Sequence, residues 1–427
     1  RLDYCDDKGV CSLASDMKTI EVKQEDYKCQ RIAVGERHSV ALAVESGRAV
    51  ILAWGSNVLG QMGVGKMTQS SRPIPVSLPA PMNTVIVQVV CGGNFSMCLS
   101  DMGTIYAWGD NSKGQLGLGD TLNRNKPEVV KAMQGTNIHT IVAGWAHAAA
   151  IASSGDASRG DDVYMWGDHQ YGQLGIGSEA EMGAYPCYPA LCAFPKSLPI
   201  PSTVTTKSGG QRERVSLALG TTHTIILVER YEVGSKKVLE SRVYTCGMGA
   251  QGQLGSYANT QWTYATPQLV TEWNLSPEDE KFLRETSRQT KAPVDSKGRQ
   301  LKLPRIHLIA ASSTASIAVS NPSDIEVVYA WGLLPGLYDD AHNTPTHIQK
   351  LANAEELKQE LGSDLPINDF RIIKVITAKS HHMLLCKYNE KANHGRAPVV
   401  FGWGETKYGK LGVGNVAKHM AMKLQES

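Results

Sequence analysis

The sequence predicts an all-β protein built from repeated four-stranded antiparallel units, the blades of a β-propeller. The prediction depends on two short elements that alternate six times along the chain. The first reads Gly-x-x-His-Ser and precedes a run of apolar residues. The second starts at Trp-Gly and continues to Gly-Gln-Leu-Gly-x-Gly. The shortest interval between first elements, Phe95 to His147, has room for about four short strands, which is one blade.

The Trp-Gly element marks the end of a strand and the turn that follows it. Its glycines supply positive φ and close backbone approach. Well-preserved copies begin at Trp54, Trp108, Trp166 and Trp403, and eroded copies begin at Cys246 and Trp331. We expect the four well-preserved tryptophans to occupy equivalent, largely buried positions between blades.

The Gly-x-x-His-Ser element places a histidine beside a hydroxyl group, a pair that can act as base and nucleophile. Adjacent residues of a strand point to opposite faces, however, and no acid recurs with the pair. The sequence therefore favours a structural histidine that hydrogen-bonds between strands inside its own blade. The copies are Gly35–Ser39, Gly92–Ser96, Gly144–Ala148 and Gly220–Thr224, with degenerate copies at Ser312–Ser316 and Lys379–Met383.

This alternation resembles the repeat of the regulator of chromosome condensation family, over about residues 30–427. The resemblance implies a seven-bladed propeller, whereas six units can be counted. The predicted fold class is therefore an all-β, six- or seven-bladed β-propeller of four-stranded antiparallel blades with short helical insertions. We expect one domain over residues 1–427, in which residues 1–30 form a partial or closing blade. The chain begins at Arg1, so we expect a processed chain or part of a longer one.

Composition argues against several other classes of protein. The 427 residues include 43 Lys plus Arg and 41 Asp plus Glu, a near balance that does not suggest a general nucleic-acid surface. No apolar run reaches the roughly 20 residues of a membrane span. The nine cysteines show no CxxC spacing typical of a zinc site. The segment 60–66 fits a P-loop, but Met67 stands where Ser or Thr would be needed. We therefore predict no cofactor, no metal and no enzymatic activity.

Insertions between the repeats distinguish this chain. They lie at 154–162, 229–242, 271–304 and 335–370. In the third, Ser276 is a predicted helix N-cap and Pro277 the first helical residue, with the helix running towards Thr290. In the fourth, residues 352–362 have a helical pattern.

The third insertion also carries the candidate binding residues. Eight basic and two acidic residues lie between Lys281 and Arg305. We expect this insertion to project from the ring rather than pack on it, and to contact a protein partner with an acidic surface. The candidate partner-binding residues are Lys281, Arg284, Arg288 and Lys291.

The sequence favours a non-catalytic interaction propeller, a scaffold or adaptor in a larger assembly. The resemblance also implies an alternative, nucleotide exchange on a small GTPase, which is what the founding member of the family does. Binding to nucleic acid is left open but is not favoured. The expected location is inside the cell, in the cytoplasm or in cytoskeletal or ciliary structures, with nucleus and mitochondrion left open.

Overall fold

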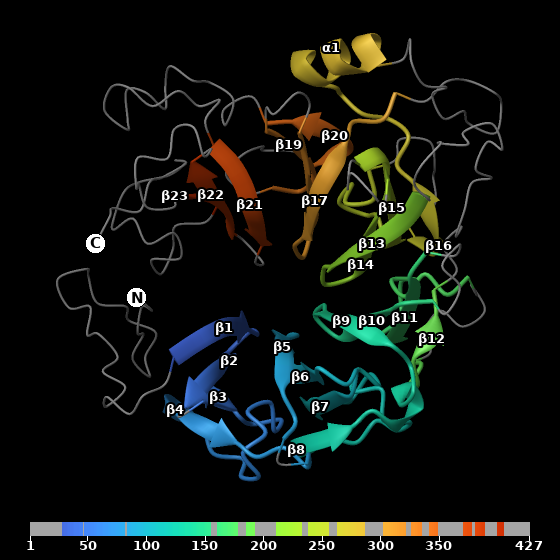
Figure 1. Cartoon of the computed structure of the whole chain (residues 1–427). Coiled ribbons are helices and arrows are strands. Elements are labelled where there is room, and N and C mark those ends of the chain that lie inside the picture. Colours follow the sequence, from blue (N-terminus) through green and yellow to red (C-terminus); the bar gives the residue numbers. More distant parts are fainter. Residues whose placement is uncertain are drawn as a thin grey trace.

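The described strands form six antiparallel sheets (Figure 1). The computed structural model describes residues 28–45, 47–81, 83–154, 160–177, 185–192, 211–232, 238–255, 263–286, 302–321, 326–334, 341–348, 370–377, 381–388 and 399–404. Within these ranges, five sheets have four strands and the sixth has three.

Each sheet is formed by strands that are consecutive in the chain. The first contains β1 (Lys28–Val34), β2 (His38–Glu45), β3 (Arg48–Gly55) and β4 (Ser70–Val76); the second contains β5 (Ile86–Cys91), β6 (Phe95–Ser100), β7 (Ile105–Gly109) and β8 (Arg124–Val129). The third contains β9 (Ile138–Ala143), β10 (His147–Ala152), β11 (Asp162–Gly167) and β12 (Ala190–Leu191); the fourth contains β13 (Gln211–Leu219), β14 (His223–Glu232), β15 (Val238–Met248) and β16 (Thr263–Leu269). The fifth contains β17 (Ile306–Ala311), β18 (Ala315–Ser320), β19 (Val327–Gly332) and β20 (His342–His347); the sixth contains β21 (Phe370–Thr377), β22 (His381–Tyr388) and β23 (Val399–Gly404).

The sheets are arranged around a common centre, with the first strand of each sheet nearest to it (Figure 1). The first strands also contact one another in chain order, from β1 to β5, β9, β13, β17 and β21. This arrangement confirms the predicted β-propeller of antiparallel blades. Residues 1–30 were expected to form a partial or closing blade. Residues 28–30 belong to β1 of the first sheet, and 1–27 lie outside the described residues.

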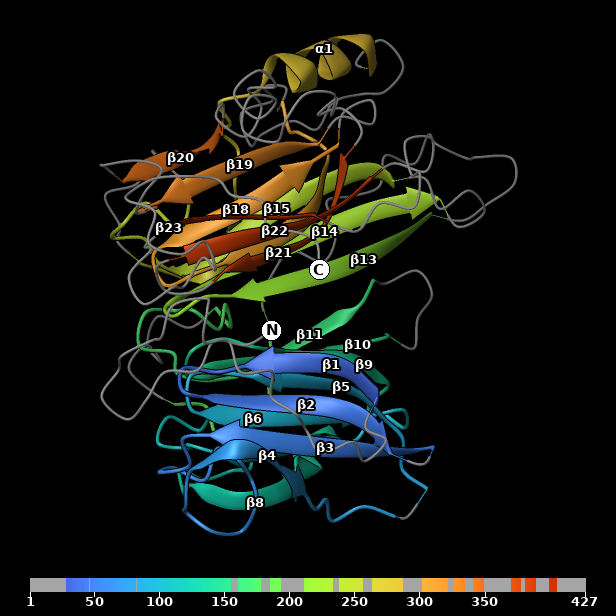
Figure 2. The same cartoon turned by 90° about the vertical axis from the view of Figure 1, so that its left-hand side faces the viewer.

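Because successive strands are antiparallel, the loops divide between the two faces of the ring (Figure 2). The loop between the first two strands of a sheet and the loop after Trp-Gly lie on one side, which we call the motif face. The hairpin between the second and third strands, and the connection to the next sheet, lie on the other side, the insertion face. The strand ends that flank residues 154–162, 229–242, 271–304 and 352–362 all lie at the insertion face.

Two helical segments are described. The α-helix α1 (Pro277–Thr286) lies at the periphery, outside the fifth sheet (Figures 1 and 2). A short 3-10 turn covers Lys131–Met133. The helix predicted at 352–362 lies outside the described residues, and the segment 335–370, expected as an insertion, contains the strand β20.

The hydrophobic core is divided among the seams between neighbouring sheets. The cluster between the first two sheets, for example, joins Leu42 and Ile51 to Val89 and Trp108. Similar clusters fill the next four seams. Every residue of β6, β10 and β18 is buried, because these strands are covered on both faces.

Three tryptophans of the Trp-Gly elements are held by the preceding sheet. Trp108 Nε1 donates to the carbonyl of Gln61 at 2.9 Å, and Trp166 and Trp331 make the same bond to Gln115 and Gln253. An added Cβ at Gly63 would lie 2.7 Å from the Trp108 ring, and Gly63 has φ +72°, so the glycine allows this approach.

Trp108 and Trp166 are fully buried, as predicted, and Trp331 in an eroded copy is buried to the same degree. Trp54 is only half-buried, because its side chain lies on the face of the first sheet that no described sheet covers. The Trp403 backbone occupies the equivalent strand position, opposite His382, but its side chain lies outside the described residues.

The repeated histidines bridge neighbouring sheets, and this corrects the prediction that they bond inside one blade. His38 Nε2 lies 2.9 Å from Ser96 Oγ, and His147 and His223 make the same contact to Thr224 and Ser316. Each hydroxyl donates onward to a glutamine carbonyl of the histidine's own sheet, as Ser96 does to Gln61. The seams therefore contain a repeated relay from histidine to hydroxyl to glutamine carbonyl.

The seam between the second and third sheets replaces this relay with an apolar contact. Phe95 takes the histidine position in the second sheet and Ala148 takes the hydroxyl position in the third. Both are fully buried in the same cluster. Pairing in the sixth sheet also shows that His381, opposite Gly404, is the residue equivalent to His38, which puts the degenerate copy one residue earlier than the sequence suggested.

Candidate functional site

The buried histidines do not supply a catalytic base. Burial lowers the pKa of His38 to about 4, of His147 to about 3 and of His223 to about 4, so all three rings are neutral near pH 7. Because Ser96 donates its proton to a carbonyl, Nε2 of His38 must donate to Ser96, which fixes the ring tautomer. The buried histidines and their hydroxyl partners hold neighbouring sheets together.

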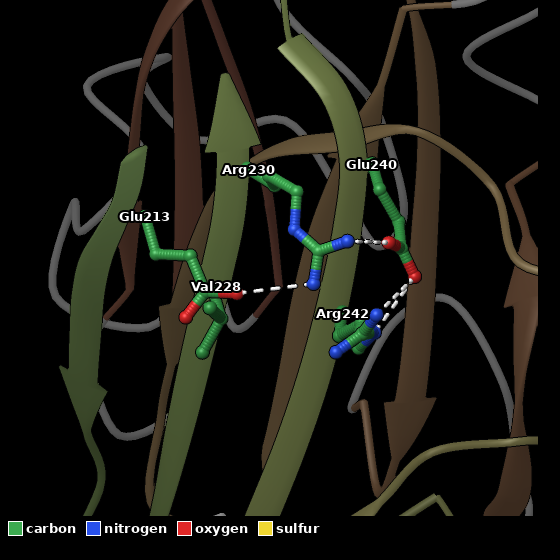
Figure 3. Close-up of a pocket in the computed structure, with 5 residues that line it drawn as sticks. All are labelled: Glu213, Val228, Arg230, Glu240 and Arg242. Carbon is green, nitrogen blue, oxygen red and sulfur yellow. Dashed lines mark hydrogen bonds and ion pairs between the residues drawn. The ribbon is translucent and has the colours of Figure 1, made fainter. Parts of the chain in front are cut away.

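A ladder of charges crosses three strands of the fourth sheet at the insertion face. Figure 3 shows Arg230 of β14 between Glu213 of β13 and Glu240 of β15. The Arg230 guanidinium lies 3.2 Å from Glu213 and 3.4 Å from Glu240. Arg242 lies 2.7 Å from Glu240. Cross-strand register explains the row, because Glu213 pairs with Arg230 and Arg230 pairs with Glu240.

The ladder lines a shallow pocket together with Val228 (Figure 3). The strands here are long, since β13, β14 and β15 extend towards the insertion face beyond the last residue of β16 that pairs with β15. The extension follows directly from the insertion at 229–242, whose described ends continue the strands. It gives the fourth sheet a charged three-stranded end.

The insertion at 154–162 meets this charged end. Asp161 accepts a hydrogen bond from the Val215 backbone at 3.4 Å, and Gly160 lies against Glu213. The insertion at 154–162 therefore contacts β13, the strand that carries Glu213 of the charge ladder.

The opposite face of the same strands carries a second ion pair. Arg214 lies 2.7 Å from Glu229, whose side chain is 1% exposed. Burial raises the pKa of Glu229, and Arg214 opposes that shift. Ser241 on this face contacts Pro304 and Ile306 before the fifth sheet, so the pair lies towards the seam between the fourth and fifth sheets.

The candidate binding residues are divided by the structure. Lys281 and Arg284 are exposed on α1, and Arg284 pairs with Glu280 at 2.8 Å. Arg288 and Lys291 lie outside the described residues. The described part of α1 also exposes Glu278 and Glu285, so its surface is of mixed charge rather than basic.

The start of the third insertion packs on the propeller, which corrects the prediction that the whole insertion projects. Ser276 is the N-cap, as predicted, and accepts a bond from the Asp279 backbone at 3.1 Å. Asp279 is fully buried and its Oδ2 accepts bonds from Ser320 at 2.8 Å and Tyr329 at 2.6 Å. Sequence reasoning missed this contact because an acid in the first turn of a helix is normally solvated. The available signal was Trp273, an aromatic residue shortly before the helix start.

No metal site or membrane span is found in the described part of the chain. Among those residues, no three His, Cys, Asp or Glu side chains gather to hold a metal ion. None of the described helices is long and apolar enough to cross a bilayer. The segment that resembles a P-loop, 60–66, is a glycine turn packed on Trp108.

Repeated four-stranded sheets around one centre, locked by the same seam contacts, define a β-propeller protein. A family model of the regulator of chromosome condensation (RCC1) repeat matches residues 50–99, 102–151 and 161–227, and a second RCC1 repeat model matches 86–115 and 138–173. The chain therefore contains RCC1 repeats and folds as an RCC1-type β-propeller. Each match of the first model runs from the third strand of one sheet to the second strand of the next.

Curated relatives carry this repeat in different settings. The Ultraviolet-B receptor UVR8 of Arabidopsis thaliana is 30% identical over 231 residues, which are 54% of this chain and 44% of that protein. The probable E3 ubiquitin-protein ligase HERC6 of Homo sapiens is 28% identical over 242 residues, which are 56% of this chain and 20% of that protein. The matched region thus spans less than half the length of these relatives.

Solved structures show the same fold. Human WBSCR16 has a TM-score of 0.62 at 16% identity, covering 94% of this chain and 83% of that one. Prp20p from Saccharomyces cerevisiae, described with its binding properties to Gsp1p and histones, has a TM-score of 0.52 at 20% identity, covering 83% and 67%.

Proposed function

We propose that this chain is a non-catalytic protein-interaction propeller that binds its partner through the insertion face. The observation that carries the proposal is the common placement of the insertions at 154–162, 229–242 and 271–304 and of the segment 352–362, whose flanking strand ends all lie on that side of the ring. Loops on a rigid scaffold are the usual place for binding residues. The motif face, by contrast, uses its repeated loops to hold neighbouring sheets together.

The charges at the insertion face support a polar partner. The charges of the ladder pair with one another, and these ion pairs tie together the end of the fourth sheet. The ladder consists of Glu213, Arg230, Glu240 and Arg242. The basic residues Lys281, Arg284, Arg288 and Lys291 remain the proposed contacts for an acidic protein surface. Exposed ion pairs are each worth little, so several must act together.

The test compares two variants of matched charge. Replacing Lys281, Arg284, Arg288 and Lys291 by Glu is expected to reduce capture of the native assembly from a cell extract, with an unchanged melting temperature. The control replaces four exposed or loop-borne bases of the motif side, Arg37, Lys66, Arg72 and Lys126, by Glu.

Equal loss of capture in both variants would indicate general charge attraction and contradict a dedicated face. The same proteins also test the alternative function, nucleotide exchange. Accelerated release of nucleotide from a small GTPase by the unaltered chain would replace the scaffold proposal with that activity.

A further inference from the structure

The segment Trp273–Asp279, which we call the strap, crosses the outer side of the fifth sheet before α1 begins. Its first anchor is Trp273, whose ring packs edge-on against Tyr329 at 5.2 Å and Trp331 at 5.8 Å between centroids. Its second anchor is Asn274, which forms a parallel bridge to Thr346 of β20. The Asn274 backbone donates to Pro345 at 3.0 Å, and its side chain donates to Thr346 at 3.0 Å.

The third anchor is the Asp279 carboxylate. Three hydroxyl groups converge on its Oδ2: Ser276 at 3.1 Å, Ser320 at 2.8 Å and Tyr329 at 2.6 Å. The Tyr329 hydroxyl also accepts the backbone N–H of Ser276 at 3.1 Å, so it joins both ends of the first helical turn. Oδ1 is buried and has no hydrogen-bond partner within the described residues.

The fifth sheet does not need the strap to complete its hydrogen bonding. β20 already pairs with β19, and the strap adds one isolated bridge outside it. Trp331 is held independently, through the Gln253 carbonyl of the fourth sheet. Beyond the strap, α1 also contacts its surroundings through the Arg305 guanidinium, which lies over the Phe282 ring at 4.6 Å.

We propose that the strap and α1 form a lid that undocks from the fifth sheet as one unit while the propeller stays folded, with the Asp279 carboxylate as its latch. Local opening of this kind is expected where an element is held by a few anchors to a sheet whose strand pairing is complete without it. Among the anchors, Asp279 contributes most to holding the lid in place. Its three hydrogen bonds end on a single charged oxygen in a buried place, whereas Asn274 is exposed.

The surface beneath the lid has a definite chemistry. Undocking uncovers the rings of Tyr329 and Trp331 together with the hydroxyl groups of Tyr329 and Ser320. These groups fit an aromatic side chain followed by a carboxylate at a helix start, which is what the strap itself presents. The occupant of this surface is therefore the chain's own strap, and opening exposes a docking surface selective for that pattern.

Hydrogen exchange followed by mass spectrometry tests the proposal on the whole chain, without any partner. Tyr329→Phe removes one hydroxyl and keeps the ring, and Asp279→Ala removes the whole latch. Exchange of the α1 amides should rise roughly tenfold in Tyr329→Phe and further in Asp279→Ala, since one hydrogen bond to a charged group is worth about that factor or more. Glu278→Ala, which changes an exposed acid of the same turn, should leave exchange in α1 nearly unchanged.

Amides of β18 and β19 must keep their slow exchange in both variants. Unchanged exchange of α1 in Tyr329→Phe and Asp279→Ala would show that the carboxylate is not the latch. A joint rise in α1, β18 and β19 would show that the strap belongs to the cooperative unit of the sheet, and would also overturn the proposal. If Asp279→Ala does not fold, Tyr329→Phe decides between these results.

Discussion

Nε2 of His38 lies 2.9 Å from Oγ of Ser96, across the seam between the first and second sheets. The Ser96 hydroxyl donates a hydrogen bond to the Gln61 carbonyl, which also accepts one from the indole N–H of Trp108. The most regular residues of the repeat therefore meet at one point, although they come from two sheets. The contact explains why the motif keeps histidine, hydroxyl, glutamine and tryptophan together without any catalytic role.

The first prediction concerns acid stability. His38, His147 and His223 have pKa values lowered by burial to about 4, 3 and 4, against roughly 6.5 in the unfolded chain. Below pH 6.5 the unfolded chain binds more protons than the folded one. The free energy of unfolding should thus decrease as pH falls from 6.5 to 4, by about 1.4 kcal/mol per pH unit for each histidine. Urea titrations across this range measure the slope.

A control for that slope is already present in the chain as Phe95 and Ala148. Copying this pair into the first seam, as His38→Phe with Ser96→Ala, leaves Gln61 with its Trp108 donor. The pH dependence of the unfolding free energy should decrease by the contribution of one histidine. An unchanged slope would mean that other groups cause the acid sensitivity.

The second prediction concerns the repeated tryptophans. Trp108→Ala should cost about 3–5 kcal/mol of unfolding free energy, because it leaves a cavity in the first seam. Trp54→Ala should cost clearly less, since that ring is only half-buried. Denaturant titration of the two variants gives the comparison. Equal losses would imply that Trp54 is covered as completely as Trp108.

The third prediction concerns the charge ladder. Arg230→Met should cost about 1–2 kcal/mol, because its largely covered guanidinium lies between two acids that would then face each other. The loss should grow at low ionic strength, where repulsion between Glu213 and Glu240 is less screened.

Arg284→Met is the matched control for the ladder. Arg284 is 80% exposed and pairs with Glu280 one helical turn away, so the loss should stay below about 0.5 kcal/mol. If both substitutions cost the same, the ladder contributes no more than an ordinary surface pair.

Periodicity was sufficient to predict the blades and the Trp-Gly positions, and the capping pattern of Ser276 and Pro277 predicted the start of α1. Gly-x-x-His-Ser and Trp-Gly recur because each blade must present the same groups to its neighbours. The partner of each histidine could not be read from this pattern. Within a strand His38 and Ser39 are adjacent, whereas the hydroxyl that His38 contacts is Ser96, which belongs to the next repeat.

The candidate binding site was less accessible to sequence reasoning. Charge counting identified the bases from Lys281 onward, but it did not reveal that Arg284 is paired or that Asp279 is buried. It also did not reveal that the insertion at 154–162 contacts the fourth sheet. That contact, from the Val215 backbone to Asp161, depends on how two sheets lie side by side.

By itself, the sequence determined that this protein is a β-propeller of RCC1 repeats, because strand length, turn glycines and the repeated aromatic are local properties. Only the tertiary structure decided that the histidines join neighbouring sheets, that the insertions at 154–162, 229–242 and 271–304 share one face and that Asp279 anchors α1. Those features depend on which residues the packing of neighbouring elements brings together. A carboxylate at a helix start is exposed or buried according to whether a neighbouring strand offers it hydroxyl groups, as Ser320 and Tyr329 do here.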